Sequence, residues 1–131
     1  MLTFGGGRMF LVAGATDMRK SFNGLAGIVR EKLQADPMSR HLFFFCNRGR
    51  NRMKVLVADE SGMWVLSKRL DRGTFAWPAA DVSTARIEYR AEQVSHLLHG
   101  FDAERLHARP WQRRVLQFSS KPLQLSALSA L

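Results

Sequence analysis

Positive charge is concentrated around two turns in the middle of this 131-residue chain. Residues 41–73 contain seven Lys or Arg against three Asp or Glu, and the whole chain carries a formal charge of +9. Cations at the tip and along the sides of a hairpin can contact phosphate groups, so the pattern predicts an anion-binding surface. Its candidate members are Arg48, Arg50, Arg52 and Lys54 around the first turn and Lys68, Arg69 and Arg72 around the second. A solvated run of surface charge is the ordinary alternative.

A second set of candidate anion ligands precedes an amphipathic segment. Thr16, Arg19 and Lys20 lie where a helix is predicted to begin. Free backbone N–H groups at a helix N-terminus attract anions, and cations beside them are otherwise unfavourable. The structural alternative is that Asp17 neutralises Arg19 or Lys20, or that Asp59 reaches them from the sheet. The sequence is compatible with both interpretations.

Residues for catalysis are sparse. The four histidines and Cys46 show no paired-cysteine or H-E-x-x-H spacing, and the phosphate-loop and nucleophile-elbow motifs are absent from the sequence. Asp17, Asp59 and Glu60 are the carboxylates that a two-metal nuclease would use, but Asp59–Gly62 is typical of a turn. We therefore predict a protein without a metal or cofactor that is not an enzyme. A metal-dependent nuclease is the weaker alternative.

Strands must position the central cations. Residues rich in Phe, Val, Leu and Trp alternate with turn residues, and connections this short require antiparallel neighbours. The predicted strands are His41–Cys46, Met53–Ala58, Met63–Leu70 and Thr74–Trp77, with further short strands at Arg8–Ala13 and Ala85–Tyr89. Because Trp64 and Trp77 lie within strand runs, we expect both in the core.

Two helices are predicted to accompany the sheet. Apolar residues recur at helical spacing from Asp17 to about Ala35, with Thr16 or Asp17 as the N-cap. Gly24 and Gly27 inside this helix predict close packing against the sheet, since glycine is otherwise costly there. Ala91–His99 is the second helix. The predicted fold class is α+β, an antiparallel β-meander of about four to six strands packed with two helices.

Composition predicts a folded, nucleic-acid-binding type of protein. The chain is 46% hydrophobic and contains nine Phe and three Trp, enough for a packed core. We predict one α+β domain at 1–102 and a C-terminal extension at 103–131 with little order. The single cysteine, Cys46, fits a reducing compartment, and the first twenty residues do not have the pattern of a signal peptide. We expect a cytoplasmic location, no membrane association and DNA as a partner.

Several blocks of residues occur together in a recognisable order. They are Thr16–Leu25, His41–Phe43, Asn47-Arg48, Arg52–Lys54, Lys68–Pro78 and Leu97–Asp102. Over residues 1–102 these blocks resemble the TnpB accessory protein of insertion-sequence family sixty-six. The resemblance implies a small protein encoded by a transposable element and needed, with companion proteins, for transposition. It also implies that a separate, larger transposase performs strand transfer. The RNA-guided nucleases that share the TnpB name are unrelated.

The chain departs from the usual pattern of that family at three places. Val57-Ala58-Asp59 stands where an aromatic run is common, which removes a possible stacking ring. Gly49 and Asn51 are uncharged residues in a loop that is often more basic. Arg90 stands where Thr is frequent before the second helix.

The leading hypothesis is an accessory factor for transposition of an insertion sequence. It would bind DNA through the basic hairpin and the helix N-terminus, with the transposase and other proteins of the same element as further partners. The alternative is a protein–protein adaptor whose positive surface docks on an acidic patch of the transposase.

Overall fold

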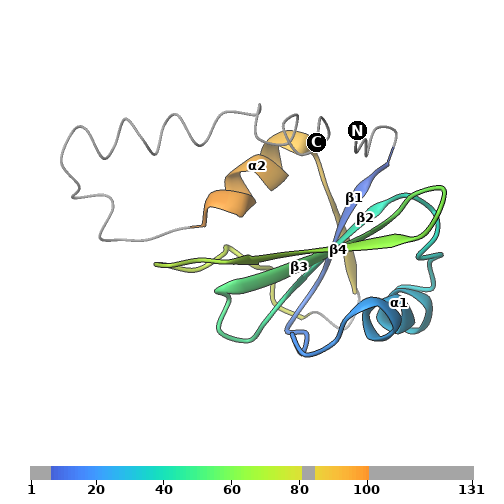
Figure 1. Cartoon of the computed structure of the whole chain (residues 1–131). Helices are drawn as coiled ribbons and strands as arrows, with labels where there is room; N and C mark the ends of the chain where they lie inside the picture. Colours follow the sequence, from blue (N-terminus) through green and yellow to red (C-terminus); the bar gives the residue numbers. More distant parts are fainter. Residues whose placement is uncertain (1–6, 81–84, 101–131) are drawn as a thin grey trace.

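The computed structural model describes residues 7–80 and 85–100, in which a five-stranded sheet lies between two helices (Figure 1). α1 and α2 cover opposite faces of the sheet, so the described part of the chain has three layers. The strands are β1 (Met9–Val12), β2 (Leu42–Cys46), β3 (Arg52–Ala58), β4 (Met63–Arg69) and β5 (Arg86–Tyr89), and the helices are α1 (Phe22–Glu31) and α2 (Ala91–His99). The fold class is α+β, as predicted.

The sheet is mixed, with the strand order β4-β3-β2-β1-β5. β2, β3 and β4 form the predicted antiparallel meander, because their connections are too short for a crossover. β1 instead runs parallel to β2, and α1 provides the long connection that this pairing needs. β5 pairs antiparallel with β1 at the far edge. The sheet is therefore mostly antiparallel, but it is more than a meander.

β2 is the central strand, and all five of its residues are buried. Its unbroken apolar sequence suits a strand that is covered on both faces. On the α1 face, Leu25 and Val29 of the helix pack with Phe43 and Phe45. The core on the α2 face comprises Leu11, Leu42, Phe44, Cys46, Met53, Val55, Val57, Phe75, Trp77, Val94 and Leu97.

Thr74–Trp77 does not form the predicted fourth strand of the meander. The segment instead folds back across the α2 face, where Phe75 and Trp77 are buried. The Trp77 indole Nε1 donates a hydrogen bond to the Val12 carbonyl oxygen at 2.9 Å. Burial of two aromatic rings with the indole satisfied outweighs the pairing that an added edge strand would gain. The core prediction is confirmed for Trp77, but it is wrong for Trp64, which is 40% exposed on the edge strand β4.

α1 is shorter than predicted. Its N-cap is Ser21, so the predicted cap at Thr16 or Asp17 is wrong. The Asp17 carboxylate accepts the backbone N–H of Arg19 at 2.9 Å, a local turn that competes with helix formation. The helix ends at Glu31, and the positive φ of Gln34 (51°) prevents its continuation to Ala35.

The two glycines of α1 do not lie where the helix packs against the sheet, so the prediction of close packing at these positions is also wrong. A Cβ placed on Gly27 would meet no atom within 4 Å. At Gly24 the nearest neighbour would be the Lys20 side chain, at 3.1 Å. Both positions therefore face away from the sheet.

The predicted domain, 1–102, and the predicted extension, 103–131, stay predictions, and the extension lies outside the described residues. None of the helices in residues 7–80 and 85–100 is long and apolar enough to cross a membrane.

Candidate nucleic-acid interface

Four segments of the chain meet at one end of the sheet. The register places Cys46 of β2 beside Met53 of β3, and Arg52 opposite Arg69 of β4. The segment after β1 joins them, because the Thr16 backbone N–H donates to the Cys46 carbonyl oxygen at 2.7 Å. We call this region the basic end, defined by Lys20, Arg48, Arg50, Arg52, Lys54 and Arg69. The structure thus brings the two predicted sets of cations to the same place.

The turn between β2 and β3 is built by its asparagines. The Asn47 side-chain oxygen accepts the backbone N–H groups of Asn51 and Arg52 at 3.0 and 3.1 Å, and its amide nitrogen donates to Asn51 Oδ1 at 2.8 Å. Asn51 therefore has a structural role in a loop that the resemblance would make more basic. With the amides organising the turn, Arg48 and Arg50 are exposed. Among residues 7–80 and 85–100, neither guanidinium has a hydrogen-bond or ion-pair partner.

Two arginines face each other across β3 and β4. Arg52 and Arg69 are directly paired in the ladder and both are exposed. Like charges in this position repel and destabilise a sheet. No carboxylate of the described residues forms an ion pair with either side chain. The repulsion would be relieved by an anion placed between the two guanidinium groups.

Lys54 has a different environment from its arginine neighbours. Its Nζ atom donates to the Lys20 carbonyl oxygen at 2.7 Å, which ties β3 to the segment that precedes α1. This bond places the Lys20 residue beside the hairpin. The Lys20 ammonium group is exposed and donates no hydrogen bond within the part of the chain that the structure describes, and its charge helps to lower the pKa of Asp17.

Arg19 is neutralised by Asp17, which is one of the two interpretations that the sequence left open. Its guanidinium binds both carboxylate oxygens of Asp17, with Nη2 at 2.7 Å from Oδ2 and Nε at 3.1 Å from Oδ1. This bond is the main reason that the pKa of Asp17 falls to about 2. Asp59 does not reach this region, since its carboxylate accepts bonds from Trp64, Ser61 and Gly62 at the opposite end of the sheet.

The remaining predicted ligands are distributed around this site. Thr16 is buried at the floor of the basic end, with its N–H already bonded to Cys46. Lys68 lies on the α2 face and donates from Nζ to the Leu98 carbonyl oxygen at 2.6 Å. Arg72 is exposed in the turn after β4. Because α1 begins at Phe22, neither Arg19 nor Lys20 occupies its first turn.

Comparison with known proteins identifies a family over most of the chain. Residues 7–108 match the family described as IS66 Orf2 like protein. The chain belongs to this family. It is 40% identical over 95 residues to the uncharacterized protein y4hO of Sinorhizobium fredii (strain NBRC 101917 / NGR234), covering 72% of this chain and 81% of that protein. It is 31% identical over 106 residues to y4jC of the same strain, covering 81% and 89%. No solved structure matches.

Membership of the IS66 Orf2-like family suggests an accessory role in transposition. The family resemblance noted in the sequence is thereby confirmed.

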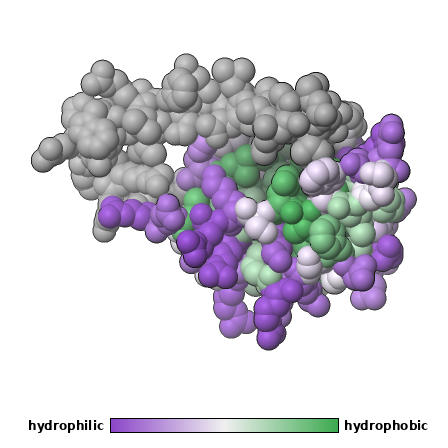
Figure 2. Space-filling model, viewed as in Figure 1, coloured by the Kyte–Doolittle hydropathy of each residue, from purple (hydrophilic) through white to green (hydrophobic). Residues whose placement is uncertain are grey.

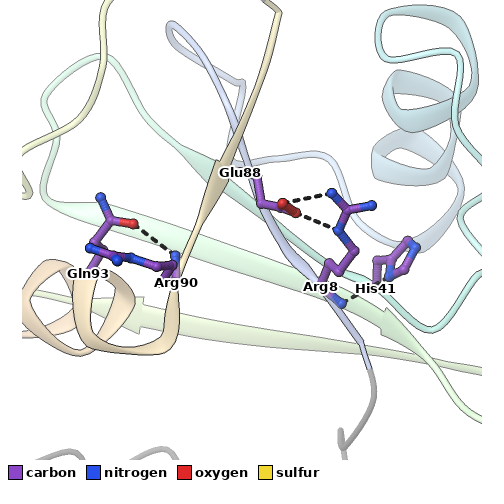
Figure 3. A network of polar contacts seen from close by, with 5 residues as sticks. All are labelled: Arg8, His41, Glu88, Arg90 and Gln93. Carbon is purple, nitrogen blue, oxygen red and sulfur yellow. Dashed lines mark hydrogen bonds and ion pairs between the residues drawn. The ribbon is translucent and has the colours of Figure 1, made fainter.

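At the opposite end of the sheet of this IS66 Orf2-like protein, Arg8 is paired with Glu88 (Figure 3). The Arg8 guanidinium binds the Glu88 carboxylate, with Nη2 at 2.7 Å from Oε1, and lowers the pKa of Glu88. The Arg8 backbone N–H donates to His41 Nδ1 at 3.0 Å. Arg40 lies 4.0 Å from Glu60. Arg8 and Glu88 are 80 positions apart, so sequence spacing gave no signal for this pair.

Potential metal ligands and nucleophiles do not gather in the described part of the chain. In residues 7–80 and 85–100, no group of three His, Cys, Asp or Glu side chains is placed to hold a metal ion. The Cys46 thiol is buried, and burial is the main cause that raises its pKa to about 11. Such a thiol is a poor nucleophile at neutral pH.

Proposed function

We propose that this IS66 Orf2-like protein is a DNA-binding accessory factor of transposition that grips phosphates with its basic end. The observation that carries the proposal is the facing pair Arg52 and Arg69, flanked by Arg48 and Arg50 and left without a carboxylate partner in the described residues. A positive surface without internal compensation is the usual electrostatic footprint of a nucleic-acid site. The element's transposase would be the second partner, and it would perform the bond breaking and joining in the cytoplasm.

The arrangement of charge on the molecule supports this proposal. Two arginines at the opposite end of the sheet lie against carboxylates, Arg8 against Glu88 and Arg40 against Glu60. In Figure 2, hydrophilic residues lie along the left, lower and right margins of the described surface, around a hydrophobic middle. Arg52 and Arg69 face each other without such a partner among the described residues, an arrangement that solubility alone would not require.

The experiment is a titration of the full chain with a short DNA duplex at several salt concentrations. Each phosphate contact contributes a slope of roughly −0.9 in log K against log salt. Removing one contact by Arg52→Gln should weaken binding and reduce the magnitude of the slope by about 0.9. Arg40→Gln is the matched control, because it removes the same charge from an exposed arginine at the opposite end.

Three results would contradict the proposal. Equal losses from Arg52→Gln and Arg40→Gln would show a general effect of net charge without a site. No duplex binding at low salt, together with transposase binding that depends on Arg52, would favour the adaptor alternative. Cleavage of the duplex in the presence of magnesium, lost in Asp59→Ala with Glu60→Ala, would favour the nuclease alternative.

A further inference from the structure

The two edge strands of the sheet differ in how they are protected. β5 is only four residues long, and two of them, Arg86 and Glu88, are charged. Glu88 is held by Arg8, and the Arg86 guanidinium lies 4.9 Å from the centre of the Phe10 ring. Short length and charged side chains are devices by which proteins prevent edge strands from pairing with other chains.

β4 is the longer edge, and its first half has none of these devices. It contains seven residues, of which Met63, Trp64, Val65 and Leu66 are apolar and at least partly exposed. The Trp64 indole donates to Asp59 Oδ2 at 2.7 Å, which fixes a large ring at this edge. β4 lies in front of the other strands in Figure 1, and Figure 2 shows hydrophobic residues at the middle of the same side.

The ladder between β3 and β4 determines which backbone groups of β4 point outward. Asp59 N–H donates to Gly62 O at 2.8 Å and Leu70 N–H donates to Asn51 O at 2.9 Å, one pair at each end of the ladder. Hydrogen-bonded pairs alternate along an antiparallel ladder, so Trp64, Leu66 and Lys68 also bond to β3. The N–H and C=O groups that face away from β3 belong to the alternate residues Met63, Val65, Ser67 and Arg69.

We infer that this edge of β4 pairs with β4 of a second copy of the chain, antiparallel and centred on Leu66. This register is self-complementary, as a two-fold interface must be. It places Val65 opposite Ser67 of the second copy and Met63 opposite Arg69, and both are hydrogen-bonded pairs. Every outward-facing group of β4 is then used, in about eight hydrogen bonds.

The side chains fit the same register. The apolar half of each β4 meets the basic half of the other, so no cation faces a cation. Leu66 packs on its symmetry copy, and Trp64 lies opposite Lys68 of the second copy on the α2 face. Lys68 is not displaced by this pairing, because its Nζ atom is directed to the Leu98 carbonyl oxygen. A register shifted toward the basic half would instead bring Lys68 or Arg69 against its own copy.

Pairing would make one ten-stranded sheet with the two basic ends at opposite ends of the strands. Each basic end lies at the C-terminal end of its own β4, and the two strands run in opposite directions. If the basic end binds DNA, as proposed above, the dimer can hold two duplexes at once. This consequence rests on the proposed function, whereas the dimer itself does not.

Cysteine crosslinking tests the register in the full chain. In the inferred pair the two Leu66 Cα atoms are about 4.5 Å apart, within disulfide range, and Leu66→Cys should form a covalent dimer under mild oxidation. Ser67→Cys is the matched control, because its Cα atoms would be about 8 Å apart and outside that range. Native Cys46 does not interfere, since it is buried. Equal crosslinking of the two variants, or none by Leu66→Cys, would overturn the inferred pairing.

A proline on β4 separates dimer formation from DNA binding. Val65→Pro removes an N–H that faces outward, so the β3–β4 ladder keeps its hydrogen bonds. Sedimentation should show a dimer for the wild type and a monomer for Val65→Pro, with an unchanged circular dichroism spectrum, while Val65→Thr stays dimeric. Val65→Pro should still bind one duplex but no longer hold two differently labelled duplexes together. A monomeric wild type, or a dimer that persists in Val65→Pro, would overturn the inference. A dimer without duplex binding would reject the proposed function alone.

Discussion

Replacing Arg69 by glutamate should make the protein more stable and less able to bind DNA. Arg69 faces Arg52 directly across β3 and β4, and neither side chain has a carboxylate partner in the described residues. Arg69→Glu converts this repulsion into an attraction. The same change places a negative charge where the proposed function needs a phosphate-binding cation. A surface selected for stability alone would not contain such a pair.

The expected gain follows from the ordinary size of cross-strand pairs. An opposite-charge pair stabilises a sheet by roughly 0.2–1 kcal/mol, and a like-charge pair destabilises it. Both side chains are exposed, so solvent screening keeps each effect near the low end of that range. Arg69→Glu should therefore raise the free energy of unfolding by about 0.5–1 kcal/mol, which corresponds to an increase of about 2–6 °C in Tm.

Urea denaturation at low and high salt measures this gain, and the duplex titration measures the loss of affinity. Arg69→Gln should show about half the stabilisation, because it removes the repulsion without adding an attraction. High salt should reduce the effect of both variants. A protein destabilised by Arg69→Glu would refute the reasoning, because Arg69 would then have an attractive partner. Unchanged DNA affinity in a stabilised variant would place the DNA elsewhere.

Three further predictions concern α1, Lys54 and the segment that precedes α1. Gly27→Ala should stabilise the protein by about 0.5–1 kcal/mol in urea denaturation, because alanine favours the helix and its Cβ meets no atom within 4 Å. A loss of stability would mean that a neighbouring segment packs against α1 at this position. Lys54→Met should cost about 0.5–1.5 kcal/mol, since it removes the hydrogen bond to the Lys20 carbonyl, yet change the DNA salt slope less than Arg52→Gln does. The pKa of Asp17 is lowered from 3.8 to about 2 mainly by the bond from Arg19, so its contribution to stability is complete above pH 3.8 and is lost as pH falls to about 2. Acid titration of Asp17→Asn should lack this component.

Local patterns were sufficient to predict the central hairpins. The apolar run of β2 and the asparagines of the next turn specify both elements and their antiparallel pairing. The parallel pairing of β1 with β2 was not predicted, because nothing in either short strand identifies a partner about 30 positions away. Thr74–Trp77 looked like a strand for a similar reason. A run of aromatic residues is compatible both with an edge strand and with a segment that packs across the sheet. Only tertiary packing decides between the two.

The candidate site was predicted residue by residue but not as a unit. Sequence analysis gave two anion sites, one on the hairpin and one at a helix N-terminus. The structure joins them through Lys54, whose ammonium group holds the backbone of Lys20. The helix dipole was expected to contribute, but Asp17 and Arg19 form a turn before α1 begins. The bonds from Arg19 to the Asp17 carboxylate are favoured over the predicted N-cap, because they satisfy both the Arg19 guanidinium and the Arg19 backbone N–H.

The contrast between the two ends of the sheet links stability to function. At the end that contains Arg8, this residue forms an ion pair with Glu88 of β5, 80 positions away. At the basic end, the ladder register alone forces Arg52 against Arg69. A single acidic substitution at either position would remove that strain. Arg52 and Arg69 therefore lower the stability of the free protein slightly, at a place where a bound polyanion would compensate their charge. The same two side chains would thus affect both folding and DNA binding.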